Sequence, residues 1–103
     1  MATAVRLIDL NYGEPLRVEA LAAAVHVSRY YFTKMFTSVM GRSPSDYIRH
    51  VRLERARALL STTSMSVSEI ARITGFGDHA QFSRMFRAVT AESPRSFRRR
   101  AQA

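Results

Sequence analysis

Two neighbouring stretches decide the fold: Ile70-Ala71-Arg72-Ile73-Thr74-Gly75-Phe76 and Gln81-Phe82-Ser83-Arg84-Met85-Phe86, with Ser93-Pro94 a few residues further on. Apolar residues recur in them at spacings of three and four, which is the period of an amphipathic helix. Gly75 stands between the two stretches, where the chain must reverse, and glycine adopts left-handed backbone angles at no steric cost. The sequence therefore predicts a helix, a tight turn and a second helix.

The same unit occurs twice in the chain. Residues 18–22, 32–36 and 43–47 match residues 67–71, 82–86 and 93–97, at separations of 49 or 50 residues. The extra residue of the second copy falls in its turn, near Gly77-Asp78, where an insertion does not disturb a helix. We therefore expect two copies of one structural unit.

Periodicity and helix-stop signals predict an all-α protein with seven helices. They are expected at Thr3–Leu10, Val18–Val25, from after Ser28 to Met40, at Pro44–Leu60, Val67–Thr74 and His79–Thr90, and in a short stretch from Pro94. Two helix-turn-helix subdomains, residues 1–43 and 61–103, are expected on either side of a long linker helix, 44–60, as a homeodomain-like pair. Ser61-Thr62-Thr63-Ser64 is the expected non-helical linker, and Arg98-Arg99-Arg100 is expected to form a mobile, solvated tail.

Five of these helices follow a residue whose side-chain oxygen can accept from free backbone N–H groups: Ser28, Ser43, Ser66, Asp78 and Ser93. Glu69 completes a capping box with Ser66. Arg17 cannot cap the helix that follows it, so that helix is expected to fray. His26 occupies the position of Gly75 in the first copy and must adopt the same left-handed conformation.

The composition limits the classes of function. The chain has 103 residues, of which 47% are hydrophobic, and no run of about 18 apolar residues that could cross a membrane. It has no Cys, which excludes disulfides and thiolate metal sites. Its net charge of +8 favours a polyanion as partner, with nucleic acid first and an anionic membrane surface second. A charge that only keeps the protein in solution is the simpler alternative.

The second helix of each copy has one apolar side and one polar side. We expect the apolar stripes to lie in the core: Phe32, Met35, Phe36 and Val39, and then Phe82, Met85, Phe86 and Val89. The opposite faces are polar, basic or small: Arg29, Tyr30, Thr33, Lys34 and Thr37, and then His79, Ala80, Ser83, Arg84 and Arg87. A helix that enters the DNA major groove needs such a face near its N-terminus. A solvated face is the alternative for one helix, but two at matching positions favour DNA recognition.

The paired pattern, with F-x-x-x-F in each second helix and S-P-x-x-[YF] after it, resembles the DNA-binding domain of the AraC/XylS family of bacterial transcription regulators. The resemblance extends from Val5 to Phe97. It implies a bilobed helical fold whose two recognition helices enter successive major grooves on one face of the DNA, often with bending. It also implies transcription activation through contact with RNA polymerase. The sequence departs from the family pattern at His26, Arg17 and Ala91, the last of which replaces a helix-ending glycine such as Gly41.

The resemblance assigns base contacts to the first turns of the two recognition helices: Arg29, Tyr30, Thr33, Lys34, His79, Ala80, Gln81, Ser83 and Arg84. Lys34 and Arg84 are the strongest candidates, because Arg can bind guanine O6 and N7 in a bidentate manner. Phosphate contacts are expected from helix starts and basic side chains: Ser28, Thr37, Asp78, Arg87 and Arg98.

A helix over 44–60 would be about 25 Å long, and one packed lobe adds about 10 Å, which together approach the 34 Å of one DNA turn. One chain could thus span two grooves as a monomer on an asymmetric site. The sequence leaves open whether the chain belongs to a longer, dimeric regulator with a sensor domain. The expected location is the cytoplasm, on the nucleoid.

No chemistry for catalysis is visible in the sequence. His26, His50 and His79 share no metal-ligand spacing with acidic residues, and there is no glycine-rich phosphate loop or nucleophile elbow. We therefore expect no enzyme activity, no cofactor, no metal and no membrane partner. A protein-interaction module built from degenerate helix-turn-helix units is the alternative to sequence-specific DNA binding.

Overall fold

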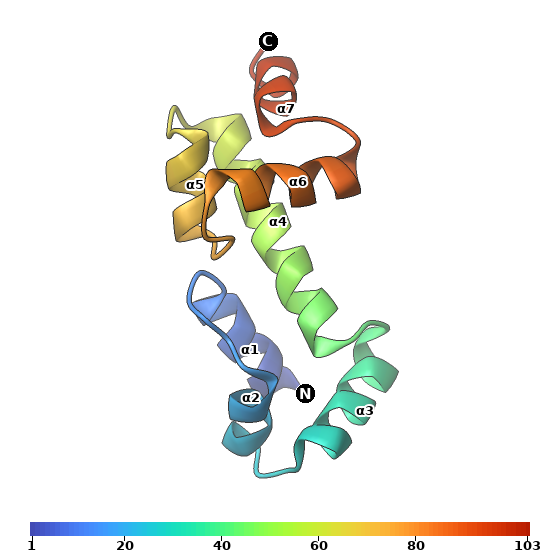
Figure 1. Ribbon diagram of the computed structural model, residues 1–103. Coiled ribbons are helices and arrows are strands. Elements are labelled where there is room, and N and C mark those ends of the chain that lie inside the picture. Colours follow the sequence, from blue (N-terminus) through green and yellow to red (C-terminus); the bar gives the residue numbers. More distant parts are fainter. The chain divides into compact units, whose positions relative to one another are not determined.

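The chain folds entirely into helices and the turns between them. Apolar residues recur at helical spacing, serine or aspartate caps begin most helices, and residues with positive φ lie in several of the turns. The structure, a computed structural model, describes residues 1–103 (Figure 1). Its seven helices are α1 (Ala2–Asn11), α2 (Val18–Ala24), α3 (Arg29–Met40), α4 (Pro44–Thr62), α5 (Val67–Ile73), α6 (His79–Thr90) and α7 (Pro94–Ala101). The all-α fold class, with seven helices, is confirmed.

The chain divides into two compact units, Met1–Val51 and Arg52–Ala103, and the division falls inside α4. The first unit contains α1, α2, α3 and the first part of α4. The second contains the rest of α4 with α5, α6 and α7. The long helix therefore joins the two units and also contributes residues to both cores.

Each unit has its own apolar core, and the two cores correspond closely. The first consists of Ala4, Ile8, Val18, Leu21, Ala22, Phe32, Phe36 and Ile48. The second consists of Leu53, Ala56, Leu60, Val67, Ile70, Ala71, Phe82, Phe86 and Phe97. Ala4 and Ile8 of α1 have counterparts in Ala56 and Leu60 of α4, all fully buried. The second part of α4 thus does for the second unit what α1 does for the first.

A chain of aromatic rings runs through each core. Phe36 lies 5.7 Å from Phe32 and 5.5 Å from Tyr47 of α4, measured between ring centroids. In the second unit, Phe86 lies 5.6 Å from Phe82 and 5.4 Å from Phe97 of α7. The Phe32–Phe36 rings are tilted and the other three pairs meet edge to face, which favours one relative orientation of the packed rings. They hold α3 against the start of α4, and α6 against α7.

The prediction that all four apolar residues of each stripe lie in the core is only partly right. The phenylalanines are fully buried, but Val39 and Val89 are 61% and 58% exposed and Met35 is 38% exposed. Residues four apart on a helix share a face more closely than residues three apart. In so small a unit, the two phenylalanines fill the space available, and their apolar neighbours remain at its edge. In α4, Leu53 and Ala56 are core residues that the sequence analysis did not identify.

The turns within the two units are built alike. His26 and Gly75 both have positive φ, 62° and 89°. The next N–H in each case bonds back to the helix: Val27 N to Ala22 O at 3.1 Å, and Phe76 N to Ala71 O at 3.0 Å. The turn is residues 25–28 in the first unit and 74–78 in the second, which confirms the extra residue there.

The predicted N-caps are all observed, but the predicted capping box and the predicted end of the long helix are not. All five expected caps accept from a backbone N–H, for example Ser28 from Tyr31 and Asp78 from Gln81. Glu69 does not complete a capping box, because its carboxylate accepts instead from Arg72. Helix α4 continues to Thr62, so half of the expected linker is helical. Ser61 and Thr62 donate their hydroxyls to carbonyls four residues earlier, at 2.8 and 2.7 Å.

Helices α3 and α6 end in the same left-handed cap but with different residues. Gly41 has φ 79° and its N–H bonds to Thr37 O, and Ala91 has φ 66° and its N–H bonds to Arg87 O. A Cβ added at Gly41 would meet no atom within 4 Å. The two positions therefore differ in backbone strain rather than in packing.

We expect Ala91→Gly to raise the free energy of unfolding by about 0.5–1 kcal/mol, because relief of left-handed strain exceeds the entropy that glycine gains in the unfolded chain. Gly41→Ala is the matched reverse change and should lower it by a similar amount. Urea unfolding followed by circular dichroism measures both. Equal stability of Gly41→Ala and the parent would contradict this account.

Candidate nucleic-acid interface

Helix α3 presents a polar face opposite its buried phenylalanines. Arg29, Tyr30 and Lys34 are exposed and Thr33 is half-buried. The Lys34 ammonium lies 6.0 Å from the Tyr30 ring centroid, at the edge of cation–π range. An exposed ring beside a cation can offer both apolar and charged contact to a base or phosphate. The structure thus brings these four sequence-predicted residues to one helix face.

Arg29, the first residue of α3, is paired with Glu19 of α2. The Arg29 Nη1 to Glu19 Oε1 distance is 2.7 Å, and the two side chains are 62% and 56% exposed. At that exposure an ion pair contributes about 0–1 kcal/mol to stability. Sequence analysis did not identify Glu19 as part of the site, because the two residues lie on different helices.

Helix α6 presents the corresponding face of the second unit. His79, Ala80, Gln81, Arg84 and Arg87 are exposed there, and Ser83 is half-buried. The His79 Nδ1 atom lies 3.4 Å from the Ser83 hydroxyl. This face is more basic toward its C-terminal end than that of α3, where Thr37 occupies the position matching Arg87.

Three expected phosphate contacts are already engaged within the protein. Ser28 and Asp78 accept from the backbone N–H groups of Tyr31 and Gln81, at 3.2 and 2.7 Å. The Thr37 hydroxyl donates to Thr33 O at 2.7 Å. Asp78 also places a negative charge at the start of α6, which disfavours an anion there. Arg87 remains an exposed cation on α6.

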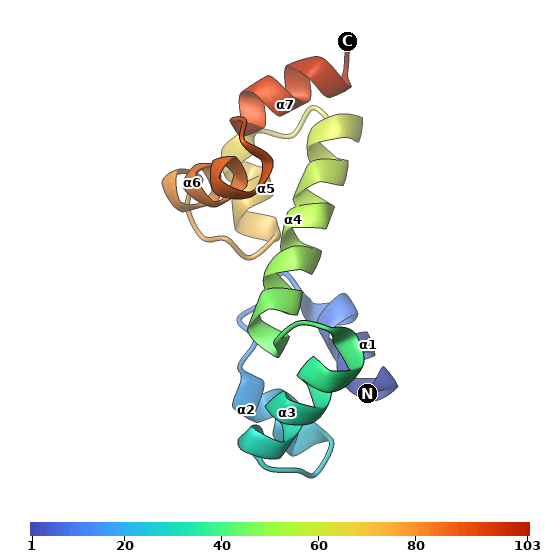
Figure 2. The same ribbon diagram turned by 90° about the vertical axis from the view of Figure 1, so that its right-hand side faces the viewer.

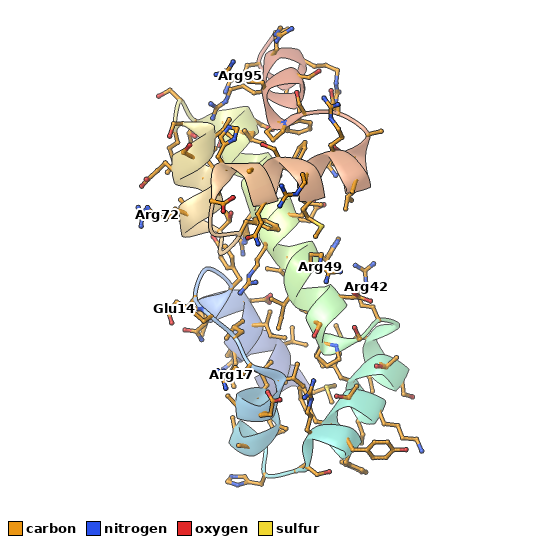
Figure 3. The ribbon with its side chains drawn as sticks, in the orientation of Figure 1. Glu14, Arg17, Arg42, Arg49, Arg72 and Arg95 are labelled. Carbon is orange, nitrogen blue, oxygen red and sulfur yellow. The ribbon has the colours of Figure 1, made fainter.

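A pocket beside α6 adds a residue that the sequence analysis missed. It is lined by Val67, His79, Ser83, Ser93, Pro94 and Arg95. Arg95 is exposed on the first turn of α7, and its side chain is labelled in Figure 3. The pocket thus brings an arginine from α7 to the two polar residues at the start of α6. The sequence did place Arg95 directly after Ser93-Pro94, at the start of a helix, and this position could have indicated a phosphate contact.

The last segment is an ordered helix rather than the expected mobile tail, and Figure 2 shows it beside the end of α4. Arg98 donates to the carbonyls of Leu60 and Thr63, at 3.2 and 3.3 Å, and Gln102 donates to the same two carbonyls, both at 2.9 Å. The final carbonyls of a helix have no partners within it. Arg98 therefore caps α4, a structural role that the sequence analysis did not predict, and its phosphate contact stays a prediction.

Arg100 is also held within the second unit. It donates to Glu92 at 2.6 Å and stacks over Phe97, with the guanidinium carbon 5.4 Å from the ring centroid. Arg57 of α4 lies over the same ring at 5.5 Å. The hydrogen bond from Arg100 lowers the pKa of Glu92 below its ordinary value, so this pair is retained down to mildly acidic pH.

No helix is both long and apolar enough to cross a membrane. No group of three or more His, Asp or Glu side chains is arranged to hold a metal ion.

Comparison with known proteins gives consistent matches. A family model described as a helix-turn-helix domain matches residues 21–100. The Msm operon regulatory protein of Streptococcus mutans is 35% identical over 97 residues, which cover 94% of this chain and 35% of that protein. The chain thus spans about a third of the length of this curated relative.

Two solved structures are similar in fold and sequence. A transcriptional regulator described by its AraC-type DNA-binding domain, from Chromobacterium violaceum, is 37% identical with a TM-score of 0.88, covering 95% of this chain and 88% of that one. The DNA-binding domain of AdpA, a global transcriptional factor solved in complex with a target DNA, is 32% identical with a TM-score of 0.89. It covers 94% of this chain and 87% of that one.

We expect Arg98→Ala to lower the free energy of unfolding by about 1 kcal/mol, because two carbonyls at the end of α4 lose a charged donor and keep only Gln102. Arg99→Ala, at an exposed neighbouring position, is the control and should change it by less than about 0.5 kcal/mol. Urea unfolding measures both. Equal effects of the two substitutions would rule out the capping role.

Proposed function

Because the chain belongs to the AraC-type helix-turn-helix family of DNA-binding transcription regulators, we propose that it binds double-stranded DNA sequence-specifically through both of its units. In this proposal α3 and α6 enter adjacent major grooves, each presenting its polar face to the base edges. The activity is transcription regulation, and we propose activation through contact with RNA polymerase.

The observation that carries the proposal is the repetition of one arrangement in both units. In each, two phenylalanines one turn apart bury one side of the second helix, which leaves the other side polar and exposed near its N-terminus. A single such face is common on any soluble protein. Two at matching positions, in a chain with a net charge of +8, fit a duplex that offers a groove at each helical turn.

We divide the candidate contacts by chemistry. The proposed base contacts are the first-turn residues Arg29, Tyr30, Thr33, Lys34, His79, Ala80, Gln81, Ser83 and Arg84. Arg87 and Arg95 are the proposed side-chain phosphate contacts. Because the side chains of Ser28 and Asp78 cap α3 and α6, we expect phosphates near them to meet the remaining free backbone N–H groups of the first helical turn. A phosphate near Thr37 would take the Thr37 hydroxyl from Thr33 O.

The proposal extends to the setting in which the domain acts. One chain, as a monomer, would occupy an asymmetric site of about 20 bp, two successive helical turns of B-DNA. The Msm operon regulatory protein is about three times as long as this chain, so the proposal concerns DNA binding and not the effector. We propose the bacterial cytoplasm, at the nucleoid, as the location.

We expect Lys34→Ala and Arg84→Ala each to weaken binding to the preferred duplex by about 1–3 kcal/mol, which is about 5–150-fold in affinity. The preferred duplex is obtained by selection from a random pool with the parent chain. Selection with Lys34→Ala should then lose base preference in one patch of the site, and selection with Arg84→Ala in another patch about 10 bp away.

Arg99→Ala serves as the control, since it removes one exposed positive charge outside both recognition helices. Loss of preference in a single shared patch, or in only one variant, would contradict insertion of both helices. A parent chain that binds all duplexes equally would instead favour the protein-interaction module.

A further inference from the structure

The Glu19–Arg29 ion pair joins two helices, unlike three pairs that lie within α4 or α5 and unlike the Glu92–Arg100 pair, which joins α7 to the segment just before it. Pairs 46–49, 54–57 and 69–72 each join two residues three apart on one helix. The Glu19–Arg29 pair instead joins the two helices of one helix-turn-helix motif, at 2.7 Å across the turn that contains left-handed His26. It therefore links the positioning helix α2 to the first residue of the recognition helix α3.

The second unit has no equivalent of this pair. The positions that match Glu19 and Arg29 are Ser68 and His79, which cannot form a carboxylate–guanidinium contact. The two units therefore share a backbone and a core but differ in how the first residue of the recognition helix is restrained. Because Arg29 is one of the proposed base contacts, this difference bears on how the first unit meets DNA.

The chemistry of the pair explains what it could do at a DNA surface. A free arginine at a helix start binds any phosphate, because the attraction is independent of sequence. A carboxylate at 2.7 Å offsets part of that charge and favours one position of the guanidinium. Arginine has five N–H donors, so those not facing Glu19 remain able to bind a base. The carboxylate thus costs non-specific affinity more than it costs base recognition.

Building on the proposed function, we infer that Glu19 is a specificity-determining residue, which positions Arg29 for base contact and suppresses its binding to phosphates of arbitrary sequence. Glu19 itself does not contact the DNA in this arrangement. The first unit is then the more selective reader of the two, through a contact that the second unit lacks.

The test compares Glu19→Gln with Glu69→Gln. Both changes remove one negative charge from an exposed ion pair on the first helix of a helix-turn-helix motif, but the partner of Glu69 is Arg72 on the same helix. Each variant is titrated by fluorescence anisotropy against the duplex selected by the parent chain and against a shuffled duplex. The titrations are repeated at salt concentrations from about 50 to about 200 mM.

Glu19→Gln should strengthen binding to the shuffled duplex by about three- to tenfold and steepen its log–log salt dependence by about 0.9, as one more phosphate is contacted. Its preference for the selected duplex should fall by a similar factor. Glu69→Gln should leave that preference unchanged. An equal loss of preference in the two variants, or none in Glu19→Gln, would overturn the inference.

A second background separates positioning from simple repulsion of DNA by Glu19. In Arg29→Ala protein, Glu19→Gln should have no effect on preference beyond that of Glu69→Gln. A persistent effect would show that Glu19 acts on the DNA directly, and would overturn the positioning role. If selection with the parent chain enriches no sequence, the proposed function itself fails. If the parent chain has a preferred duplex and Glu19→Gln does not change that preference, only the inference about Glu19 fails.

Discussion

The burial of two phenylalanines one helical turn apart is the constraint on which each unit depends. Phe32 and Phe36 anchor α3, and Phe82 and Phe86 anchor α6, each pair continuing into a ring on the following helix. Burial of such a narrow apolar stripe fixes the rotation of the helix about its own axis. The polar face is therefore aimed by the core, and recognition chemistry can vary on one side while the packing stays the same on the other.

The arginines of this chain serve two different purposes, which a net charge of +8 does not distinguish. Arg98 and Arg100 hold α7 to the second unit, one by capping α4 and the other through Glu92 and the face of Phe97. Arg84 and Arg87 stand exposed on α6. The net charge therefore does not say which arginines are placed for a polyanion, and the structure separates those that hold α7 from those exposed on α6.

The two units keep the same backbone while differing in local strain. His26 and Ala91 adopt left-handed angles for which glycine is used at Gly75 and Gly41. Each strained residue belongs to a different unit, so neither copy is the ideal version of the fold. The shared geometry survives because the helices on both sides of each turn are secured by their own cores.

The sequence by itself determined the helices, their caps, the left-handed turns and the polar faces of α3 and α6, because these depend on residues within about five positions of one another. Only the tertiary structure decided that Val39 and Val89 lie outside the cores, that α4 belongs to both units, that Arg29 meets Glu19 and that Arg98 caps α4. Those outcomes depend on which helices pack together, and residues 10 or 38 positions apart leave no periodic signal of their contact.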